Sequence, residues 1–473
     1  MWIAIRFPFL PLEIFLRGSS TPEPFAVEEQ HRVLLCDRKT AGRGVRAGMA
    51  ISAALALAPN LRTVPRDPAG ETEALLGIAA WAGQFTPGVA LDFPFAVLLE
   101  TSGSLRLFRG LEALIENLRN GVAELGYHAV FAGAPTPRAA SCLAFAGYQK
   151  FIGTALDLDT ALAPLPVGTL AGRQDTLEAL EAIGVRTLGE LYALPREGVA
   201  RRFGQALLDD LDRALGRLPD PRNFFIPPAK FHASIELPAE VTQAEALVFA
   251  GKRLIAQFAG FLVARSGGTQ RFILKLAHRD MAPTTIAIGL VAPSRDAEHF
   301  TLLLRERLAS LRLREPVRSI MLEADEVIPL AGSNHPLLLE QDKPQGRWEH
   351  LVERLSARLG ADAVQGLACH AEHRPERATA TAGLGVTSLE LDLGERPFWL
   401  LESPKLLPEV SGMPQHEGSL ELLAGPERVE SGWWDGGDVF RDYFIARTQT
   451  QSLLWIFCDR RGEGGWYLHG IFA

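Results

Sequence analysis

The sequence predicts an α+β protein of several domains. Its 473 residues are enough for about three or four domains, and 47% apolar with 22% charged residues is typical of folded globular chains. Strand-like and helix-like apolar patterns alternate along the chain, and their character changes near Leu170 and again near Pro221. We expect domains over 1–168, 169–218 and 222–330, a linker over 331–345 and a C-terminal region over 346–473.

The N-terminal residues predict a protein without a targeting segment. Residues 1–16 are apolar, but they lack a basic leader and are interrupted by Arg6, Pro8 and Pro11, so we expect no signal peptide and a cytoplasmic location. No stretch approaches the roughly 18–20 apolar residues of a membrane-spanning helix, and we expect no contact with a membrane.

The cysteine spacing favours neither disulfides nor a zinc ribbon, because the four cysteines are scattered without a CxxC pair. Cys369, His370 and His373 form the one Cys/His cluster. Without further ligands at metal spacing, we interpret it as a surface or packing feature. We assign no cofactor.

The first domain is predicted to pack helices on a mostly antiparallel sheet. Ser102-Gly103 is a turn signal that predicts a hairpin between residues 97–101 and 104–108. Leu111–Leu125 has the apolar spacing of one helical face. We expect further strands at 2–7, 33–36 and 128–132, and further helices at 12–16, before Leu57, at 71–84 and at 138–145.

Between 170 and 217 the pattern predicts short helices. Asp175 with Glu178, and Thr187 with Glu190, have the spacing of a capping box. Gly184 lies between them, where a glycine can adopt the left-handed conformation that ends one helix. The stretch is similar to a helix-hairpin-helix unit, whose backbone N–H groups bind DNA phosphate, so we assign Gly184 to a DNA-binding turn. An ordinary small helical subdomain explains this stretch equally well.

The third domain is predicted to have the order β-α-β-β-α-β, and it is basic. The whole chain has a net charge of −8, whereas residues 251–320 hold 12 Lys/Arg against 5 Asp/Glu, which gives +7 there and −15 elsewhere. Arg271 and Lys275 share one face of the strand 269–277 because side chains alternate. A solvated charged face is the alternative to a phosphate-binding surface. We assign DNA binding to Lys252, Arg253, Arg271, Lys275 and Arg279.

The order of these domains resembles the palm, thumb and little finger of Y-family translesion DNA polymerases. Gly44-Val45-Arg46-Ala47-Gly48-Met49 is similar to a segment in the fingers of that family. Active members carry Asp-x-Asp after the first strand and Asp-Glu at a palm hairpin, because carboxylates must hold two Mg²⁺ ions. In this chain the carboxylate positions fall on Arg6, Pro8, Phe95 and Ala96, and the triphosphate-binding positions on Arg38 and Ala41.

These replacements give three functional hypotheses. We expect no catalytic residue and no metal ligand in the chain, and therefore a scaffold without nucleotidyl transfer. A divergent active polymerase that uses Glu13, Asp92 and Glu100 as replacement ligands is the second hypothesis. The third is a clamp or RecA-partner module that never touches DNA, which the net charge of −8 favours.

The C-terminal residues extend the resemblance over the whole chain. Five tryptophans after residue 398 predict a compact β-rich module with aromatic side chains in its core. ImuB-type proteins are catalytically degenerate, UmuC-like members of the Y family. Four segments of this chain are similar to the ends of such proteins: Gly432–Gly436, Arg441–Phe444, Leu454–Phe457 and Trp466–Ala473.

The resemblance to ImuB-type proteins implies an adaptor in translesion synthesis and SOS-type, damage-induced mutagenesis. Its expected partners are DNA, a sliding clamp, a RecA-like ImuA-type protein and an error-prone replicative-type DNA polymerase. The clamp peptide of the family, Gln-Leu-x-Leu-Phe, falls on His335, Pro336, Leu337, Leu338 and Leu339.

Overall fold

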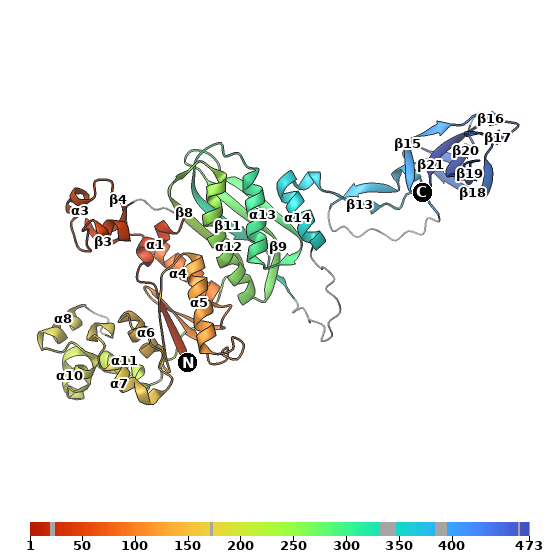
Figure 1. Cartoon of the computed structure of the whole chain (residues 1–473). Coiled ribbons are helices and arrows are strands. Elements are labelled where there is room, and N and C mark those ends of the chain that lie inside the picture. Colours follow the sequence, from red (N-terminus) through yellow and green to blue (C-terminus); the bar gives the residue numbers. More distant parts are fainter. Residues whose placement is uncertain (19–23, 171–173, 331–346, 384–394, 462–463, 473) are drawn as a thin grey trace. The chain divides into compact units, whose positions relative to one another are not determined.

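The computed structural model describes residues 1–18, 24–170, 174–330, 347–383, 395–461 and 464–472. The expected clamp peptide, residues 335–339, lies outside the described residues. The chain divides into two compact units, Met1–Arg358 and Leu359–Ala473 (Figure 1).

The palm is an antiparallel sheet with the strand order β5-β6-β1-β7. Its side chains alternate between two faces. Ile3 and Ile5 of β1 pack in the core formed with α4 and α5, whereas Ala4 lies in the core that includes α6. The palm elements are β1 (Trp2–Arg6), α1 (Leu10–Leu16), α4 (Pro68–Ala82), β5 (Gly88–Asp92), β6 (Ala96–Glu100), α5 (Leu111–Leu125), β7 (Val130–Ala134) and α6 (Pro137–Phe145).

The palm hairpin differs from the prediction. It joins β5 to β6 through Phe93-Pro94-Phe95, and residues 104–108 form turns instead of a strand. The turn at Ser102-Gly103 is closed locally, because the Ser104 N–H donates to Thr101 O at 2.9 Å. The turn consists of a proline between two phenylalanines and lacks the glycine that usually indicates a hairpin in a sequence. The corrected register places Asp92 directly opposite Ala96.

The fingers are a small sheet with the order β3-β2-β4. The turn that resembles the family segment contains Gly44 and Gly48, whose φ angles are 96° and 81°, a conformation that favours glycine. The Gly48 N–H donates to Val33 O at 2.7 Å, which folds the turn back onto β3. The elements are β2 (Phe25–Glu29), β3 (Arg32–Cys36), α2 (Arg38–Gly42), α3 (Ile51–Leu57) and β4 (Arg62–Pro65).

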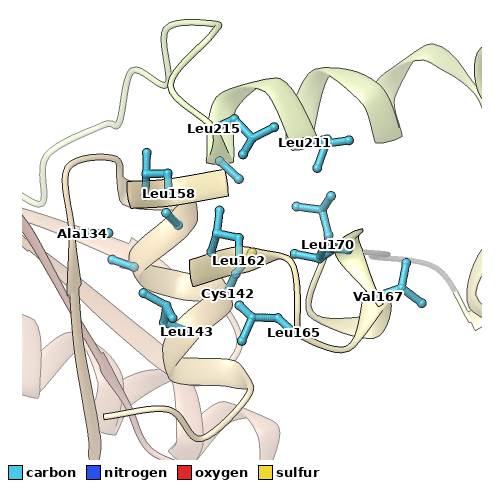
Figure 2. Packing of buried hydrophobic residues seen from close by; sticks show 14 of the residues in the cluster. Ala134, Cys142, Leu143, Leu158, Leu162, Leu165, Val167, Leu170, Leu211 and Leu215 are labelled. Carbon is cyan, nitrogen blue, oxygen red and sulfur yellow. The ribbon is translucent and has the colours of Figure 1, made fainter. Parts of the chain in front are cut away.

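The thumb helices share the core of the palm. Figure 2 shows Leu158 and Leu162 of α7 close to Cys142 of α6. Leu211 of α11 and Leu215, which follows that helix, belong to the same buried cluster. This cluster continues to the palm strands through small side chains such as Ala4 and Ala132. The helices are α7 (Leu158–Leu162), α8 (Gln174–Ala182), α9 (Leu188–Tyr192), α10 (Arg196–Phe203) and α11 (Gln205–Ala214), with short 3₁₀ turns at Ala155–Asp157 and Val167–Thr169.

Two helix-cap expectations in the thumb have different outcomes. Thr187 and Glu190 form the expected capping box at the start of α9. Asp175 lies within the first turn of α8 and not before it, so the expected cap at Asp175 is wrong. Gly184 has the expected left-handed conformation, with φ 86°.

The little finger has the expected β-α-β-β-α-β order, with the sheet order β10-β9-β11-β8. Helices α12 and α13 cover its inner face, where Phe258, Phe272 and Phe300 pack together. The elements are β8 (Phe231–Val241), a 3₁₀ turn at Ala244–Ala246, α12 (Leu247–Ala264), β9 (Gly267–Ala277), β10 (Thr284–Ser294), α13 (Ala297–Ala309), β11 (Val317–Ala324), β12 (Ile328–Pro329) and α14 (Arg347–Leu359).

Helix α12 also packs against the palm. A Cβ atom added at Gly260 of α12 or at Gly121 of α5 would overlap the ring of Trp81 on α4, so both glycines allow close packing around that indole. Among the described residues, Ala244–Ala264 is the one helical stretch long and apolar enough to cross a membrane. Most of its apolar side chains are buried in the little-finger core.

The C-terminal unit is β-rich, as expected. Its main sheet has the order β15-β21-β20-β19-β18, and Tyr443, Trp455 and His469 stack in its core. The strands are β13 (Gly366–Cys369), β14 (Thr379–Ala382), β15 (Trp399–Leu406), β16 (Glu409–Val410), β17 (Met413–Pro414), β18 (Glu421–Ser431), β19 (Val439–Arg447), β20 (Leu453–Asp459) and β21 (Gly465–Ile471), with 3₁₀ turns at Ala361–Ala363 and Pro375–Arg377.

Candidate functional site

The end of the palm sheet brings Arg6, Ala96 and Asp92 into one row. Arg6 of β1 pairs with Ala96 of β6, and Ala96 pairs with Asp92 of β5. Residues directly opposite each other on antiparallel strands point to the same face. This is the face covered by α6, because Ala4, Ala90 and Leu98 on the same strands pack in the core with α6.

Arg6 points to the end of α6. Its Nη1 donates to the Phe145 carbonyl oxygen at 2.7 Å, and its guanidinium lies 4.5 Å from the centre of the Phe145 ring, a favourable cation–π distance. Burial lowers the pKa of Arg6. A cation therefore lies in the row where the family resemblance expects a carboxylate.

Asp92 is the one carboxylate of this row, and both of its oxygens have partners. Ser141 of α6 donates to Oδ2 at 2.5 Å, and Arg222 donates from Nη1 to Oδ1 at 3.3 Å. Arg222 also binds Asp220 at 2.8 Å. The Arg222 and Asp92 side chains are only 17% and 14% exposed, so solvent screens this ion pair weakly.

The other two carboxylates of the divergent-polymerase hypothesis lie elsewhere. Glu100 is opposite Trp2, at the far end of the strands that carry Ala96 and Arg6, and it binds the N-terminal ammonium at 3.4 Å. Glu13 of α1 accepts the His128 N–H at 3.0 Å. Burial raises the pKa of Glu13, although the contacts with His128 oppose this effect. Within the described residues, Glu13, Asp92 and Glu100 do not form a common ligand set.

The residues aligned with the remaining metal positions have no ligand oxygen in their side chains. Pro8 follows β1, and Phe95 lies in the hairpin turn, where the Arg66 guanidinium is 5.7 Å from its ring centre. The donor set at this end of the palm thus consists of a guanidinium and one carboxylate that is bound to an arginine.

The little-finger sheet places Arg271 and Lys275 on its outer face, as expected. The neighbouring positions on β10 are small, because Arg271 pairs with Gly289 and Lys275 pairs with Thr285. Arg271 is exposed and makes no ion pair with another described residue, whereas Lys275 binds Glu323 at 2.6 Å. This face is a mixture of charges, in which Arg271 is the more available cation.

The other expected DNA-binding cations lie apart from that face. Arg279 follows β9 and binds Glu240 at 3.0 Å. Lys252 is exposed on α12, among the helices that cover the opposite face. Arg253 contacts the palm, where it donates to the Arg17 carbonyl oxygen and lies 4.3 Å over the Phe249 ring.

Arg253 is held in a largely buried contact between palm and little finger. Burial, followed by the neighbouring Arg17 charge, lowers the pKa of Arg253 to about 10. Arg17 itself bonds to Tyr127 and Gln257. This arrangement gives Arg253 a structural part in joining two domains, and the sequence carried no signal for it.

The turn at Gly184 has no free backbone N–H group to offer a phosphate. The Gly184 and Val185 N–H groups donate to the Glu181 and Leu180 carbonyl oxygens. The next N–H groups, of Arg186 and Thr187, donate to Glu190 Oε2 at 2.7 and 3.0 Å. Those of Leu188, Gly189 and Glu190 donate to Leu165 O, Ala163 O and Thr187 Oγ1. A phosphate would have to replace one of these acceptors.

Two surface features were missed by sequence reasoning. Arg318 is exposed, and the pairing of Ser319 with Ala277 brings it to the end of the sheet where Arg279 follows β9. Trp433 and Trp434 are 80% and 59% exposed instead of buried in the core. The sequence Gly-Trp-Trp-Asp-Gly could have indicated this exposure, because glycines on both sides of a tryptophan pair are typical of a surface turn.

The palm, fingers, thumb and little-finger elements follow one another in the order expected of a Y-family polymerase-like fold. Residues 16–144 match the impB/mucB/samB family. Two relatives extend the likeness: Protein ImuB of Caulobacter vibrioides strain NA1000 / CB15N and Protein ImuB of strain ATCC 19089 / CIP 103742 / CB 15. Each is 27% identical over 461 residues, which cover 91% of this chain and 100% of the relative.

These findings support an ImuB-type, Y-family polymerase-like protein. They support a role in mutagenic DNA damage tolerance. Among solved structures, a Dbh ternary complex is 17% identical with a TM-score of 0.38 and covers 69% of this chain and 100% of its own. DinB from Sulfolobus solfataricus is also 17% identical with a TM-score of 0.38 and covers 70% of this chain and 99% of its own.

Proposed function

We propose that the protein is a DNA-binding adaptor without polymerase activity that acts in mutagenic, damage-induced lesion bypass in the cytoplasm. The main support is the row at the end of the palm sheet, where Arg6 occupies the position of a metal-binding carboxylate. Mg²⁺ requires oxygen ligands in near-octahedral geometry, and two-metal phosphoryl transfer requires carboxylates that bridge both ions. Arg6 together with Asp92, which Arg222 neutralises, does not fit this requirement.

The DNA-binding part of the proposal rests on the outer face of the little finger. Arg271 stands next to Gly289 on the adjacent strand, so no bulky side chain prevents the approach of a sugar–phosphate backbone. Arg318 and Arg279 add cations at the end of the sheet where β9 finishes, apart from the strand face that carries Arg271. Contacts of this kind position a protein on DNA without reading its sequence, which suits a protein that acts at lesions in any sequence.

The C-terminal unit is proposed to bind a protein partner, either the RecA-like protein or the error-prone polymerase. The Trp433 and Trp434 rings are in edge contact, with centroids 5.4 Å apart, and both are exposed. Tryptophans of this kind dominate many protein interfaces. The sliding clamp is assigned to His335–Leu339, whose three leucines provide an apolar plug with a weaker polar contact than glutamine would give.

A primer-extension assay tests the absence of catalysis. Purified full-length protein is incubated with a primed template, deoxynucleotides and either Mg²⁺ or Mn²⁺, and we expect no incorporation with either ion. The Asp92→Ala variant is the matched control for contaminating polymerases, because any background should be the same for both proteins. Templated incorporation that disappears in Asp92→Ala would contradict the proposal and favour a divergent polymerase.

A further inference from the structure

Three side chains with metal-ligand chemistry meet where α14 packs on the little finger. His299 belongs to the first turn of α13, and His350 and Glu353 come from α14. Their candidate ligand atoms all lie within 4.8 Å of one another. His299 and Glu353 are 5% and 4% exposed, whereas His350 is exposed. The cluster therefore has a buried floor and one side that is open to solvent.

Two of the three side chains are already oriented by hydrogen bonds. Glu353 Oε1 accepts the Val291 N–H at 2.7 Å, and its other oxygen contacts His299 Nε2. The backbone N–H of His299 donates to Asp296 Oδ1 at 3.2 Å, which fixes the start of α13. Glu353, whose Oε1 is held by the Val291 N–H, therefore loses little freedom when a metal binds through its other oxygen.

The position of His350 is the observation that packing alone does not explain. The buried contact between His299 and Glu353 would be complete without another ring. His350 nevertheless stacks on His299, with ring centroids 3.9 Å apart and an angle of 17° between the planes. His350 and Glu353 are three residues apart on α14, a spacing that places both on one side of a helix.

We propose that His299, His350 and Glu353 form a binding site for a divalent transition-metal ion, with Zn²⁺ the best match. Two imidazoles and one carboxylate are a common protein ligand set for Zn²⁺, with a water molecule as the fourth ligand. Tetrahedral coordination at about 2.0–2.1 Å needs ligand atoms about 3.3 Å apart. The hydrogen-bonded pair of His299 and Glu353 must open by less than about 1 Å and give up the proton it shares, and rotation of the exposed His350 side chain brings in the third ligand atom.

The location of the site gives metal binding a structural consequence. Helix α14 is also attached to α13 by an ion pair between Arg354 and Glu306 at 3.1 Å, and Val352 is buried. A metal ion would add a strong link between the two helices. In the sequence, α14 separates the expected clamp peptide from the C-terminal unit, so the ion would fasten the helix between two partner-binding parts to the DNA-binding domain.

Metal titration of the full-length, untagged and metal-free protein tests this site. Isothermal titration with Zn²⁺ and the visible absorption of bound Co²⁺ measure stoichiometry and coordination. We expect one tight site per chain, a Co²⁺ spectrum typical of tetrahedral coordination, and a rise in the thermal unfolding midpoint with Zn²⁺. In His350→Ala we expect at least a tenfold weaker affinity and no such rise, while the metal-free midpoint stays unchanged because His350 is exposed.

His373→Ala is the matched control, because His373 is an exposed histidine in the separate Cys369–His370–His373 cluster. We expect it to bind Zn²⁺ as the unmodified protein does. Equal binding by the unmodified protein and His350→Ala would overturn the proposal, and so would loss of binding in His373→Ala. Glu353→Gln gives a second test, since its amide oxygen can still accept the Val291 N–H while metal affinity should fall.

Discussion

Arg222 donates a hydrogen bond to Asp92 at 3.3 Å, so a residue beyond the thumb neutralises a carboxylate at the end of the palm sheet. The same guanidinium binds Asp220 at 2.8 Å. Arg222 thus holds two carboxylates, and the end of the palm sheet is tied to the segment that leads into the little finger.

The two partners of this ion pair should differ in their effect on stability. Arg222→Ala leaves two carboxylates without their cation, so we expect a loss of about 2–3 kcal/mol in the free energy of unfolding. Asp92→Ala leaves Arg222 paired with Asp220, and a loss of about 1 kcal/mol is expected. Urea denaturation followed by circular dichroism measures both. Lys230→Ala, which breaks an exposed pair with Asp325, is the control and should change stability by less than about 0.5 kcal/mol. Equal losses for Arg222→Ala and Asp92→Ala would contradict this account.

DNA affinity should depend on the strand face of the little finger and not on its helices. In the double variant Arg271→Glu with Lys275→Glu, we expect weaker binding to a primer–template duplex. We also expect the slope of log affinity against log salt concentration to become less steep by about two, because two phosphate contacts are lost. Fluorescence anisotropy at several salt concentrations measures both quantities.

The control for that experiment is Lys252→Glu with Arg305→Glu, which makes the same change in charge on exposed residues of α12 and α13. It should keep most of the affinity. An equal loss in both double variants would mean that net charge, and not the strand face, governs binding.

The C-terminal unit should lose stability in mild acid because of His469. Burial lowers the pKa of His469 to about 4, and an unfolded histidine has a pKa of about 6.5. The unfolded state therefore takes up the proton first as the pH falls. The stability that comes from neutral His469 is complete above about pH 6.5 and is lost toward pH 4, a change of about 3 kcal/mol.

Thermal unfolding of full-length protein and of His469→Gln between pH 7.5 and 5 measures this contribution. The nearby groups are Tyr443, whose hydroxyl is 2.8 Å from Nδ1, and Glu376, 3.9 Å from Nε2. Glu372 belongs to the same unit, and its hydrogen bond with Arg374 lowers its pKa to about 2. Its protonation therefore changes the stability of the unit mainly below about pH 5, outside the measured pH range. Identical pH dependence in the two proteins would show that His469 is not responsible.

Partner binding by the C-terminal unit should depend on Trp433 and Trp434. Replacement of both by alanine should weaken the affinity for the RecA-like protein or the polymerase at least tenfold and leave the unfolding midpoint unchanged, because both rings are exposed. Surface plasmon resonance with each purified partner measures the affinity. Trp399→Ala provides a comparison at a similarly exposed tryptophan, 64% exposed, of the same unit. Unchanged affinity for both partners in the double variant would contradict the proposed interface.

The accuracy of sequence reasoning differed between local and long-range features. The little-finger elements were predictable, because alternation along Arg271–Lys275 and helical spacing are local patterns. The palm hairpin was missed, since a Phe-Pro-Phe turn lacks the usual glycine signal. The left-handed conformation of Gly184 could be predicted because glycine adopts it readily. The hydrogen bonds from the Arg186 and Thr187 N–H groups to Glu190 could not, because they depend on how the turn closes.

In the candidate site, too, local features could be predicted from the sequence and long-range contacts could not. That Arg6 and Pro8 replace metal-binding carboxylates follows from comparison with a family pattern, and it stays a prediction. The pairing of Asp92 with Arg222 joins residues that are 130 positions apart in sequence, and no local pattern reports it. Arg253 was expected to contact DNA because it is basic, whereas the packing of α12 against the palm makes it a half-buried structural residue.

The leucine cluster shared by α6, α7 and α11 has a practical consequence for dissecting the chain. A fragment that starts near Leu170 would leave Leu211 and Leu215 without the side chains of Leu158 and Leu162 that complete their hydrophobic environment. Truncated proteins should therefore keep everything from the first strand through α11 together.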